Sequence, residues 1–157
     1  MKKLEVGDMA PKFFLLDQDN ALVSSDHFLG KNVLLFFYPK AMTPSCTIQA
    51  CNLRDKLENF KYFNTEIIGI STDKPKKLLR FMEKEMLNFT LLSDFEHKVS
   101  KKFGVWKKKT FIGKDYYGVD RTSFFIDSTG FIRKIFNNFQ ANTHHELVLN
   151  YIKLNLR

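Results

Sequence analysis

The 157-residue chain is long enough for one domain with a complete hydrophobic core. Hydrophobic residues make up 44% of the chain and only two residues are cysteines, which excludes a small fold held together by disulfides. The formal net charge is +8, but the lysines lie in short clusters such as 74–77 and 107–109, among acidic and apolar neighbours. Such clusters lack the basic stripe with stacking aromatic residues that is typical of nucleic-acid binding. We expect a single domain over residues 1–157, a solvated lysine-rich surface and no nucleic-acid partner.

The N-terminal region has the wrong pattern for a signal peptide. Residues 1–14 begin basic but include Glu5 and Asp8 before the first apolar cluster. The longest unbroken apolar run, residues 33–38, is far too short to span a bilayer. We therefore expect a cytoplasmic protein that does not enter the membrane. In that compartment, paired cysteines are more often catalytic, redox-active or metal-binding than structural.

The first half of the chain predicts a strand pair followed by a βαβ unit. Residues 10–25 suggest two short strands around a turn at 17–20. Residues 32–39 form a continuous apolar run that is typical of a strand buried on both faces. A helical stretch from 44 to about 63 leads to a second buried strand at 65–73. Because a helix joins these two strands, we expect them to be parallel.

The second half adds, in chain order, a helix at 74–86, a strand at 89–94, a short helix at 96–104, a hairpin at 121–137 and a final helix from 143. The hairpin turn is expected at Asp127 to Gly130. Thr143 and Glu146 have the spacing of a capping box, and His144 and His145 in that first turn are expected to be exposed. This order predicts an α/β fold: a central mixed sheet flanked by helices, matching a thioredoxin-like sheet with an extra N-terminal strand pair.

Helix-start rules give Cys46 a particular position. Thr43 is a good N-cap and Pro44 suits the first helical position, so Cys46 falls in the first turn. Its sulfur then lies over unpaired backbone N–H groups and the positive end of the helix dipole, which favour thiolate over thiol. The turn also follows a buried strand, at the sheet edge where α/β folds place their sites. The alternative is that Cys46 is an ordinary small core residue.

The second cysteine lies five residues further along the same predicted helix. With standard helix dimensions, the Cα atoms of Cys46 and Cys51 are about 8.6 Å apart and roughly 140° apart around the axis. A disulfide requires Cα atoms within about 7 Å, so an intact helix cannot bridge the pair. The spacing therefore suits a switch between a reduced helical state and an oxidised, locally unfolded state.

Residues 37–55, "FYPKAMTPSCTIQACNLRD", contain the motif Pro-x-x-x-Thr-x-x-Cys as Pro39, Thr43 and Cys46. The segments "GISTDKPKKLLRF", "LNFTLLSDFEHKVSKKFGVW" and "DRTSFFIDSTGFI" extend the likeness over nearly the whole chain. The chain resembles the peroxiredoxins, specifically the bacterioferritin-comigratory-protein (PrxQ) subfamily. One position departs from the pattern, since Ser45 stands where the subfamily commonly has glycine. Serine is compatible with the helix start, and its effect on local unwinding is left open.

The resemblance implies a thioredoxin-like (peroxiredoxin) fold and a thiol-dependent peroxidase that reduces hydrogen peroxide and organic hydroperoxides to water and alcohols in antioxidant defence. It implies that Cys46 is the peroxidatic cysteine, which becomes a sulfenic acid. Cys51 is the implied resolving cysteine, which forms an intramolecular Cys46–Cys51 disulfide. Thr43 is expected to supply a hydroxyl beside the sulfur, Pro39 to shield the pocket, and Arg121 to supply the catalytic cation.

The resemblance also implies how the enzyme is reset and assembled. An external dithiol must reduce the disulfide, and thioredoxin is expected in that role, with glutaredoxin as the alternative. No cofactor is implied, and an internal resolving thiol removes the need for a partner subunit, so we expect a monomer. The preferred hydroperoxide does not follow from the sequence.

Three alternatives are weighed against this interpretation. A thioredoxin-like disulfide reductase would need Cys-x-x-Cys at the helix start, and the chain lacks that spacing. A non-enzymatic basic binding module would tolerate loss of Cys46 and would bind polyanions in a salt-dependent way. Metal binding is disfavoured, because the histidines and cysteines have no ligand spacing.

Arg54 is an alternative to Arg121 as the cation near the sulfur, although a surface role or pairing with Asp55 or Glu58 explains Arg54 more simply.

Overall fold

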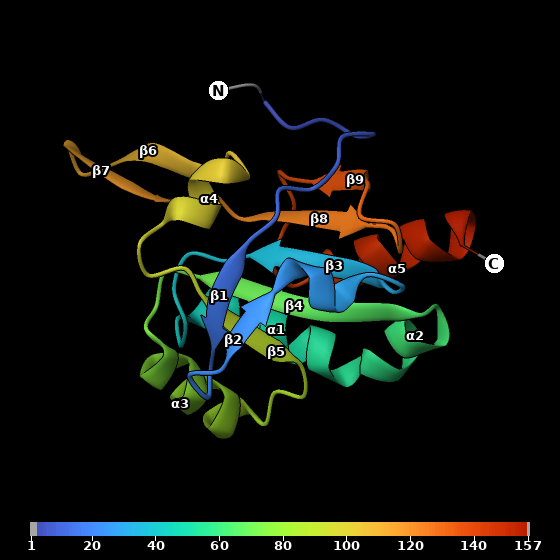
Figure 1. The fold of residues 1–157 in the computed structure, drawn as a ribbon. Helices are drawn as coiled ribbons and strands as arrows, with labels where there is room; N and C mark the ends of the chain where they lie inside the picture. The colour runs from blue at the N-terminus through green and yellow to red at the C-terminus, as the bar shows by residue number, and fades with distance from the viewer. Residues whose placement is uncertain (1–2, 157) are drawn as a thin grey trace.

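The computed structural model describes residues 3–156, so both ends of the expected domain lie outside the described residues. One mixed sheet of seven strands runs in the order β2–β1–β5–β4–β3–β8–β9, and β6 and β7 form a separate two-stranded ribbon (Figure 1). The strands are β1 (Phe14–Asp17), β2 (Leu22–Ser24), β3 (Asn32–Phe37), β4 (Thr65–Ser71), β5 (Thr90–Ser93), β6 (Trp106–Phe111), β7 (Lys114–Val119), β8 (Thr122–Ile126) and β9 (Ile132–Phe136). The helices are η1 (Ser25–Phe28), α1 (Pro44–Asp55), α2 (Leu57–Tyr62), α3 (Pro75–Glu85), α4 (Lys98–Lys102) and α5 (His144–Asn155).

The pairing of the central strands confirms the expected α/β plan. β3 pairs in parallel with β4 and antiparallel with β8, so the sheet is mixed. The expected N-terminal strand pair is β1 and β2, and the expected hairpin is β8 and β9. Every residue of β3 is buried, because layers of structure cover both faces of the strand.

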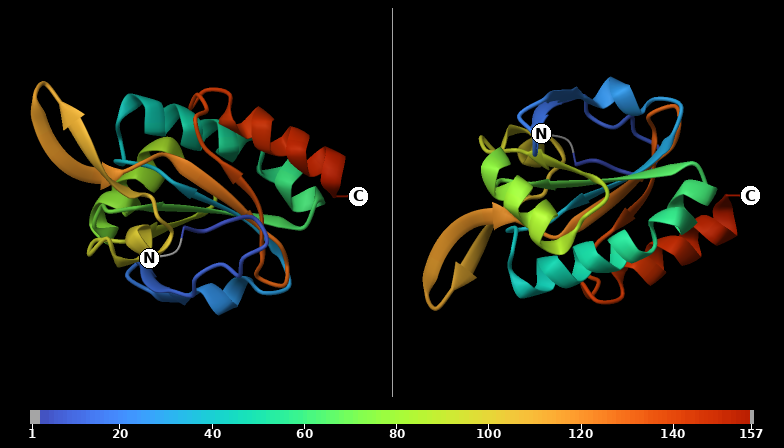
Figure 2. Two further views of the ribbon diagram at one scale, coloured as in Figure 1. Left: turned by 90° about the horizontal axis from the view of Figure 1, so that it is seen from above. Right: turned by 90° about the horizontal axis from the view of Figure 1, so that it is seen from below.

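Figure 2 shows the two layers that cover the sheet: α1, α2 and α5 lie on one side, and the N-terminal segment with η1 lies on the other. Side chains alternate between these layers along β3. Leu34 and Phe36 belong to the cluster that contains Cys46, whereas Leu35 and Phe37 pack in the opposite cluster. The thiol therefore belongs to the layer that contains α1, α2 and α5, to which α3 also contributes Leu78 and Phe81.

One expectation about regular structure was wrong, and one element was missed. The helix expected over 44–63 is broken at Lys56, whose backbone (φ −107°, ψ 11°) separates α1 from α2. The segment holds no glycine or proline between those helices that would have indicated a break. The ribbon at 106–119 was not predicted, because most of its side chains are exposed on both faces and no apolar alternation marks it. The one signal in the sequence was Gly113, because the turn between the strands has positive φ at Ile112 and Gly113.

The start of α5 also differs from expectation. The Thr143 side chain makes no capping hydrogen bond; its hydroxyl donates instead to the carbonyl of Gln140. His144 and His145 are buried rather than exposed, with relative exposures of 0% and 9%. The helix buries 144, 148 and 152, a four-residue spacing that places His144 on the core face of the helix. The sequence predicted a solvent-exposed His144. In the structure its ring instead contacts the rings of Phe36 and Phe139.

The turn of the predicted hairpin depends on the carboxylate of Asp127. It accepts hydrogen bonds from the backbone N–H groups of Thr129 and Phe131, from the Thr129 hydroxyl and from Arg133 Nε. Burial alone would raise the pKa of Asp127, but these donors more than offset it and lower the pKa to about 2. A carboxyl with a depressed pKa stabilises the fold above its unfolded pKa of about 3.9, and the contribution is lost as the pH falls through the folded value.

We therefore predict that Asp127→Asn lowers the free energy of unfolding at pH 7 by about 1–2 kcal/mol. Urea unfolding of both proteins between pH 7 and pH 2 measures the effect. The difference between them should be constant above about pH 5 and should shrink as the pH approaches 2. A difference that stays the same down to pH 2 would contradict the role assigned to the carboxylate.

Candidate active site

Cys46 lies where the central strand meets the first long helix. β3 ends at Phe37, residues 38–43 form a tight connection, and α1 begins at Pro44 with Thr43 at the N-cap position, as predicted. Cys46 is the third residue of α1 and its side chain is only 2% exposed. The connection is anchored from outside, because the backbone N–H of Ala41 donates to Asp73 Oδ2 at 2.7 Å. The sulfur is thus held at the N-terminus of a helix in a mostly dry site.

Arg121 contacts the sulfur from the neighbouring strand. Its Nη2 donates to Cys46 Sγ at 3.3 Å, and its Nη1 donates to Gln49 Oε1. The two residues meet because Phe37 at the end of β3 pairs with Thr122 at the start of β8, next to Arg121. A guanidinium at this distance, together with the helix N-terminus, favours negative charge on the sulfur. Of the two cations considered from the sequence, Arg121 is the one that the structure brings to Cys46.

Thr43 and Pro39 lie in the same connection. Thr43 occupies the N-cap position, but its hydroxyl donates to the carbonyl of Lys40 at 2.7 Å and makes no capping bond. The sequence prediction of a side-chain cap is therefore wrong. Pro39 is half-buried two residues after β3 ends. The roles of both residues toward a substrate stay predictions.

Cys51 lies near the other end of α1, and both cysteines are free thiols within this one continuous helix. The Cys51 sulfur lies 3.7 Å from Glu85 Oε1 and 3.6 Å from Arg54 Nη1. Arg54 also pairs with Asp55 at 2.9 Å, as the simpler interpretation of the sequence expected. Arg54 therefore belongs to the surroundings of Cys51 and not to those of Cys46.

Sequence reasoning missed three buried polar residues beside this cluster. Gln49 is 1% exposed and lies three residues after Cys46, on the same helix face, and this spacing was the available signal. Ser123 Oγ and His144 Nε2 are 2.7 Å apart, a contact that only the folding of α5 onto β8 creates. Burial, with smaller effects of Arg121 and His145, lowers the pKa of His144 to about 3, so this histidine is neutral near pH 7.

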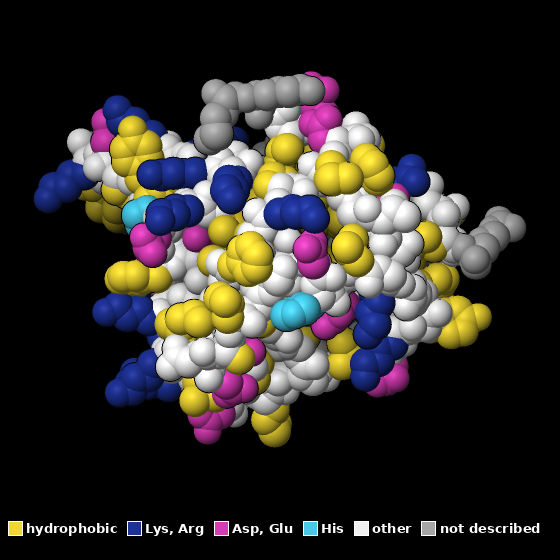
Figure 3. All heavy atoms as spheres, viewed as in Figure 1, with side chains coloured by type: hydrophobic (Ala, Val, Ile, Leu, Met, Phe, Trp, Pro, Cys, Tyr) yellow, Lys and Arg dark blue, Asp and Glu magenta, His cyan; other side chains and the backbone are white. Residues whose placement is uncertain are grey.

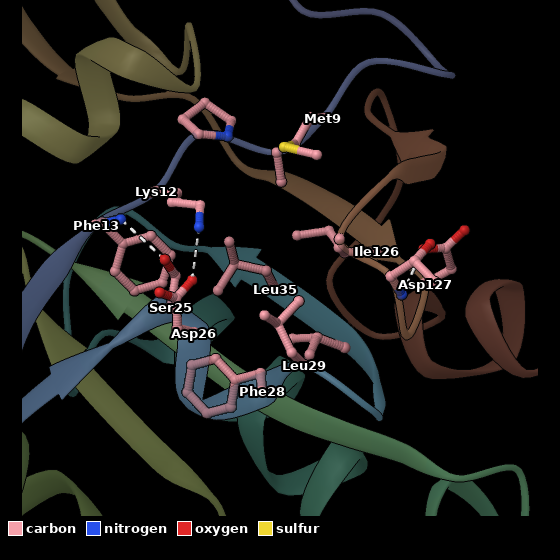
Figure 4. A pocket seen from close by; sticks show the side chains of 15 residues that line it. Met9, Lys12, Phe13, Ser25, Asp26, Phe28, Leu29, Leu35, Ile126 and Asp127 are labelled. Carbon is pink, nitrogen blue, oxygen red and sulfur yellow. Dashed lines mark hydrogen bonds and ion pairs between the residues drawn. The ribbon is translucent and has the colours of Figure 1, made fainter.

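Figure 3 shows basic side chains on one face lying among acidic and hydrophobic ones. On the face of the sheet opposite Cys46, a pocket of about 170 Å³ lies between the N-terminal segment, η1, β3 and β8 (Figure 4). Its lining is mostly apolar, includes the ion pair of Lys12 and Asp26 at 3.0 Å, and contains neither cysteine.

Within residues 3–156, no group of three or more His, Cys, Asp or Glu side chains could hold a metal ion. No helix in that range is both long and apolar enough to cross a membrane.

The arrangement around Cys46 suits nucleophilic chemistry at sulfur. A thiolate would be stabilised by Arg121 and by the first backbone N–H groups of α1, and the same donors could stabilise charge that develops on a bound oxygen. The neighbouring thiol, Cys51, gives an oxidised Cys46 a partner within the same helix. The chemistry that follows is oxidation of one thiol and condensation with a second.

Comparison with known proteins supports this chemistry. Residues 6–135 match the model of the AhpC/TSA family. The chain is 54% identical to peroxiredoxin Bcp of Escherichia coli over 153 residues, 98% of each chain. The crystal structure of peroxidoxin BcpB from Mycobacterium tuberculosis is similar, with a TM-score of 0.86 and 34% identity over 97% of this chain and 98% of that one. A structure of Xanthomonas campestris bacterioferritin comigratory protein, described with its alkyl peroxide reduction activity, has a TM-score of 0.86 and 25% identity over 90% of both chains.

Substitution of Arg121 tests its role beside the sulfur. Lysine retains the charge but carries it on one nitrogen, and it lacks the planar guanidinium whose Nη1 and Nη2 reach Gln49 and Cys46 separately. We predict that Arg121→Lys slows the oxidation of Cys46 by hydrogen peroxide about tenfold, and Arg121→Gln about 100-fold, because a charge-assisted donor is lost. Loss of free thiol in a Cys51→Ser background measures the rate.

Arg80→Lys serves as the control for this prediction, since Arg80 is exposed on α3. The control variant should react at the rate of the unsubstituted protein. Arg121 variants that react as fast as the Arg80 variant would show that the guanidinium does not assist the sulfur.

Proposed function

Because the chain belongs to the AhpC/TSA family, we propose that Cys46 is the peroxidatic cysteine and Cys51 the resolving cysteine of a peroxiredoxin. The enzyme is a thiol peroxidase, as its whole-chain relationship to peroxiredoxin Bcp requires. The observation that carries the assignment of residues is the contact of Arg121 Nη2 with Cys46 Sγ at 3.3 Å, in the first turn of α1.

In the first half-reaction the Cys46 thiolate attacks one oxygen of a hydroperoxide. A sulfur–oxygen bond forms, the oxygen–oxygen bond breaks, and the second oxygen takes a proton to leave as water or alcohol. Arg121 and the backbone N–H groups at the start of α1 stabilise the negative charge that passes from sulfur to the leaving oxygen. Pro39 shields the sulfur from bulk water, and Thr43 orients the oxygen that is attacked.

The substrate class includes organic hydroperoxides as well as hydrogen peroxide. The alkyl peroxide reduction described for the X. campestris relative supports this proposal.

In the second half-reaction Cys51 condenses with the sulfenic acid. A sulfur–sulfur bond forms, the sulfur–oxygen bond breaks and water leaves. Because the two thiols lie five residues apart in unbroken α1, the helix must unwind locally before they can bond. Ser45, in the turn that unwinds, takes the place of the glycine common in the subfamily.

An external dithiol then reduces the Cys46–Cys51 disulfide. We assign thioredoxin to this step, with glutaredoxin as the alternative, in a monomeric cytoplasmic enzyme of antioxidant defence. A role as a disulfide reductase is not favoured, because the helix start holds one cysteine and lacks Cys-x-x-Cys. A basic binding module does not explain the family relationship or the arginine at the sulfur.

Two cysteine variants test the division of roles. Cys46→Ser should abolish peroxide consumption with thioredoxin, thioredoxin reductase and NADPH. Cys51→Ser should retain the first oxidation of Cys46, seen as one sulfenic acid per chain, and should lose steady-state turnover with thioredoxin. NADPH oxidation and intact mass measure the two effects. Normal turnover of the Cys51 variant with thioredoxin would refute an internal resolving thiol.

A further inference from the structure

The Cys51 sulfur is held between two charged side chains that the peroxide chemistry at Cys46 does not use. On one side Glu85 Oε1, from the last residue of α3, lies 3.7 Å away and accepts the thiol proton in a hydrogen bond. On the other side Arg54 Nη1, one turn along α1, lies 3.6 Å away. The Cys51 sulfur therefore lies at a contact between α1 and α3, five residues along α1 from Cys46.

The same two residues also join the helices directly. Arg54 Nη1 donates to the backbone carbonyl of Glu85 at 2.5 Å, and Asn88 Nδ2 donates to the backbone carbonyl of Arg54 at 3.2 Å. The chain turns sharply here, since Met86 caps α3 in the left-handed conformation at φ 50°. The last turn of α1 is thus fixed to the end of α3 through contacts that include the thiol.

Burial and the neighbouring carboxylates favour the thiol form of Cys51. Burial raises the pKa of Cys51; Arg54 opposes this effect, whereas Glu85 and Asp55 add to it. A protonated sulfur can donate to the Glu85 carboxylate, but a thiolate 3.7 Å from that carboxylate would be repelled. The reduced enzyme therefore keeps Cys51 as a poor nucleophile that is attached to α3.

We propose that Glu85 and Arg54 are positioning residues for the second half-reaction: they hold the Cys51 thiol on α3 until α1 unwinds, and their release sets how fast Cys51 reaches oxidised Cys46. This inference rests on the resolving role proposed for Cys51. The step is Cys46–SOH plus Cys51–SH giving the disulfide and water. The Cys51 proton joins the departing hydroxide, the Cys46 sulfur is reduced and the Cys51 sulfur is oxidised. No further reactant is required.

Two substitutions with opposite expected signs separate this role from a merely structural one. In a Cys46→Ser background, the pH dependence of iodoacetamide alkylation reports the ionisation of Cys51. Glu85→Gln keeps the shape and the backbone carbonyl but removes the repelling charge, so the midpoint should fall and alkylation at pH 7 should become about tenfold faster. Arg54→Gln removes the stabilising cation, so the midpoint should rise.

The control is Glu83→Gln, an exposed carboxylate on the same helix, which should leave the midpoint unchanged. Simple loosening of the α1–α3 contact would expose Cys51 in both test variants and would shift both midpoints in the same direction. Shifts of the same sign, or no shift in Glu85→Gln, would overturn the inference.

The rate of disulfide formation provides the second measurement, with both cysteines present. After one equivalent of hydrogen peroxide, Glu85→Gln should form the Cys46–Cys51 disulfide several-fold faster than the unsubstituted protein and the Glu83→Gln control, with an unchanged rate of Cys46 oxidation. If the unsubstituted protein forms the disulfide and Glu85→Gln forms it no faster, the inference fails and the proposed function stands. If the unsubstituted protein oxidises Cys46 but never forms the disulfide, both fail.

Discussion

The contact between the Arg121 guanidinium and the Cys46 sulfur is the interaction on which the rest of this molecule depends. A cysteine that is 2% exposed is an ordinary core residue unless a charged group contacts its sulfur. Arg121 does so from a position 75 residues away in the chain, because the antiparallel register of β3 and β8 brings the two strand ends together. The register of the buried sheet therefore sets the distance between the Cys46 sulfur and the Arg121 guanidinium.

Helix α1 has two tasks that conflict. Its first turn must be intact to hold Cys46 against the backbone N–H groups, and in the proposed reaction it must open before Cys51 can reach the oxidised sulfur. The structure separates these tasks along the helix. The N-terminal end is fixed to the sheet through Arg121 and Gln49, and the other end is fixed to α3 through Arg54 and Glu85. The proposed reaction therefore requires one folded and one locally unfolded arrangement of the same twelve-residue helix.

Much of the fold follows from local pattern. The continuous apolar runs at β3 and β4 and the proline at the start of α1 each contain their own signal, and the structure confirms these elements. The ribbon β6–β7 escaped prediction because exposed strands lack apolar alternation. The burial of His144 escaped it because histidine in a polar first turn is expected in water. Only the packing of α5 against Phe36 and Phe139 decides otherwise.

The candidate site was predictable where helix geometry or the family motif applied. The position of Cys46 in the first turn of α1 follows from Thr43 and Pro44. The arginine came from the resemblance to peroxiredoxins and not from spacing along the chain. The surroundings of Cys51 could not be predicted, because Glu85 and Arg54 meet only when the end of α3 packs on α1. Contacts of that kind depend on tertiary packing, which local sequence does not encode.

Trapping the first oxidation product tests the central claim most directly, because exposure and charge favour different thiols. Cys51 is the more accessible sulfur, whereas Cys46 is buried beside the guanidinium. Reduced protein should be mixed with one equivalent of hydrogen peroxide in the presence of dimedone, quenched at increasing times, and mapped by peptide mass spectrometry. The account predicts that the sulfenic acid label appears first on Cys46 alone. A label that appears first on Cys51, or equally on both sulfurs, would contradict it.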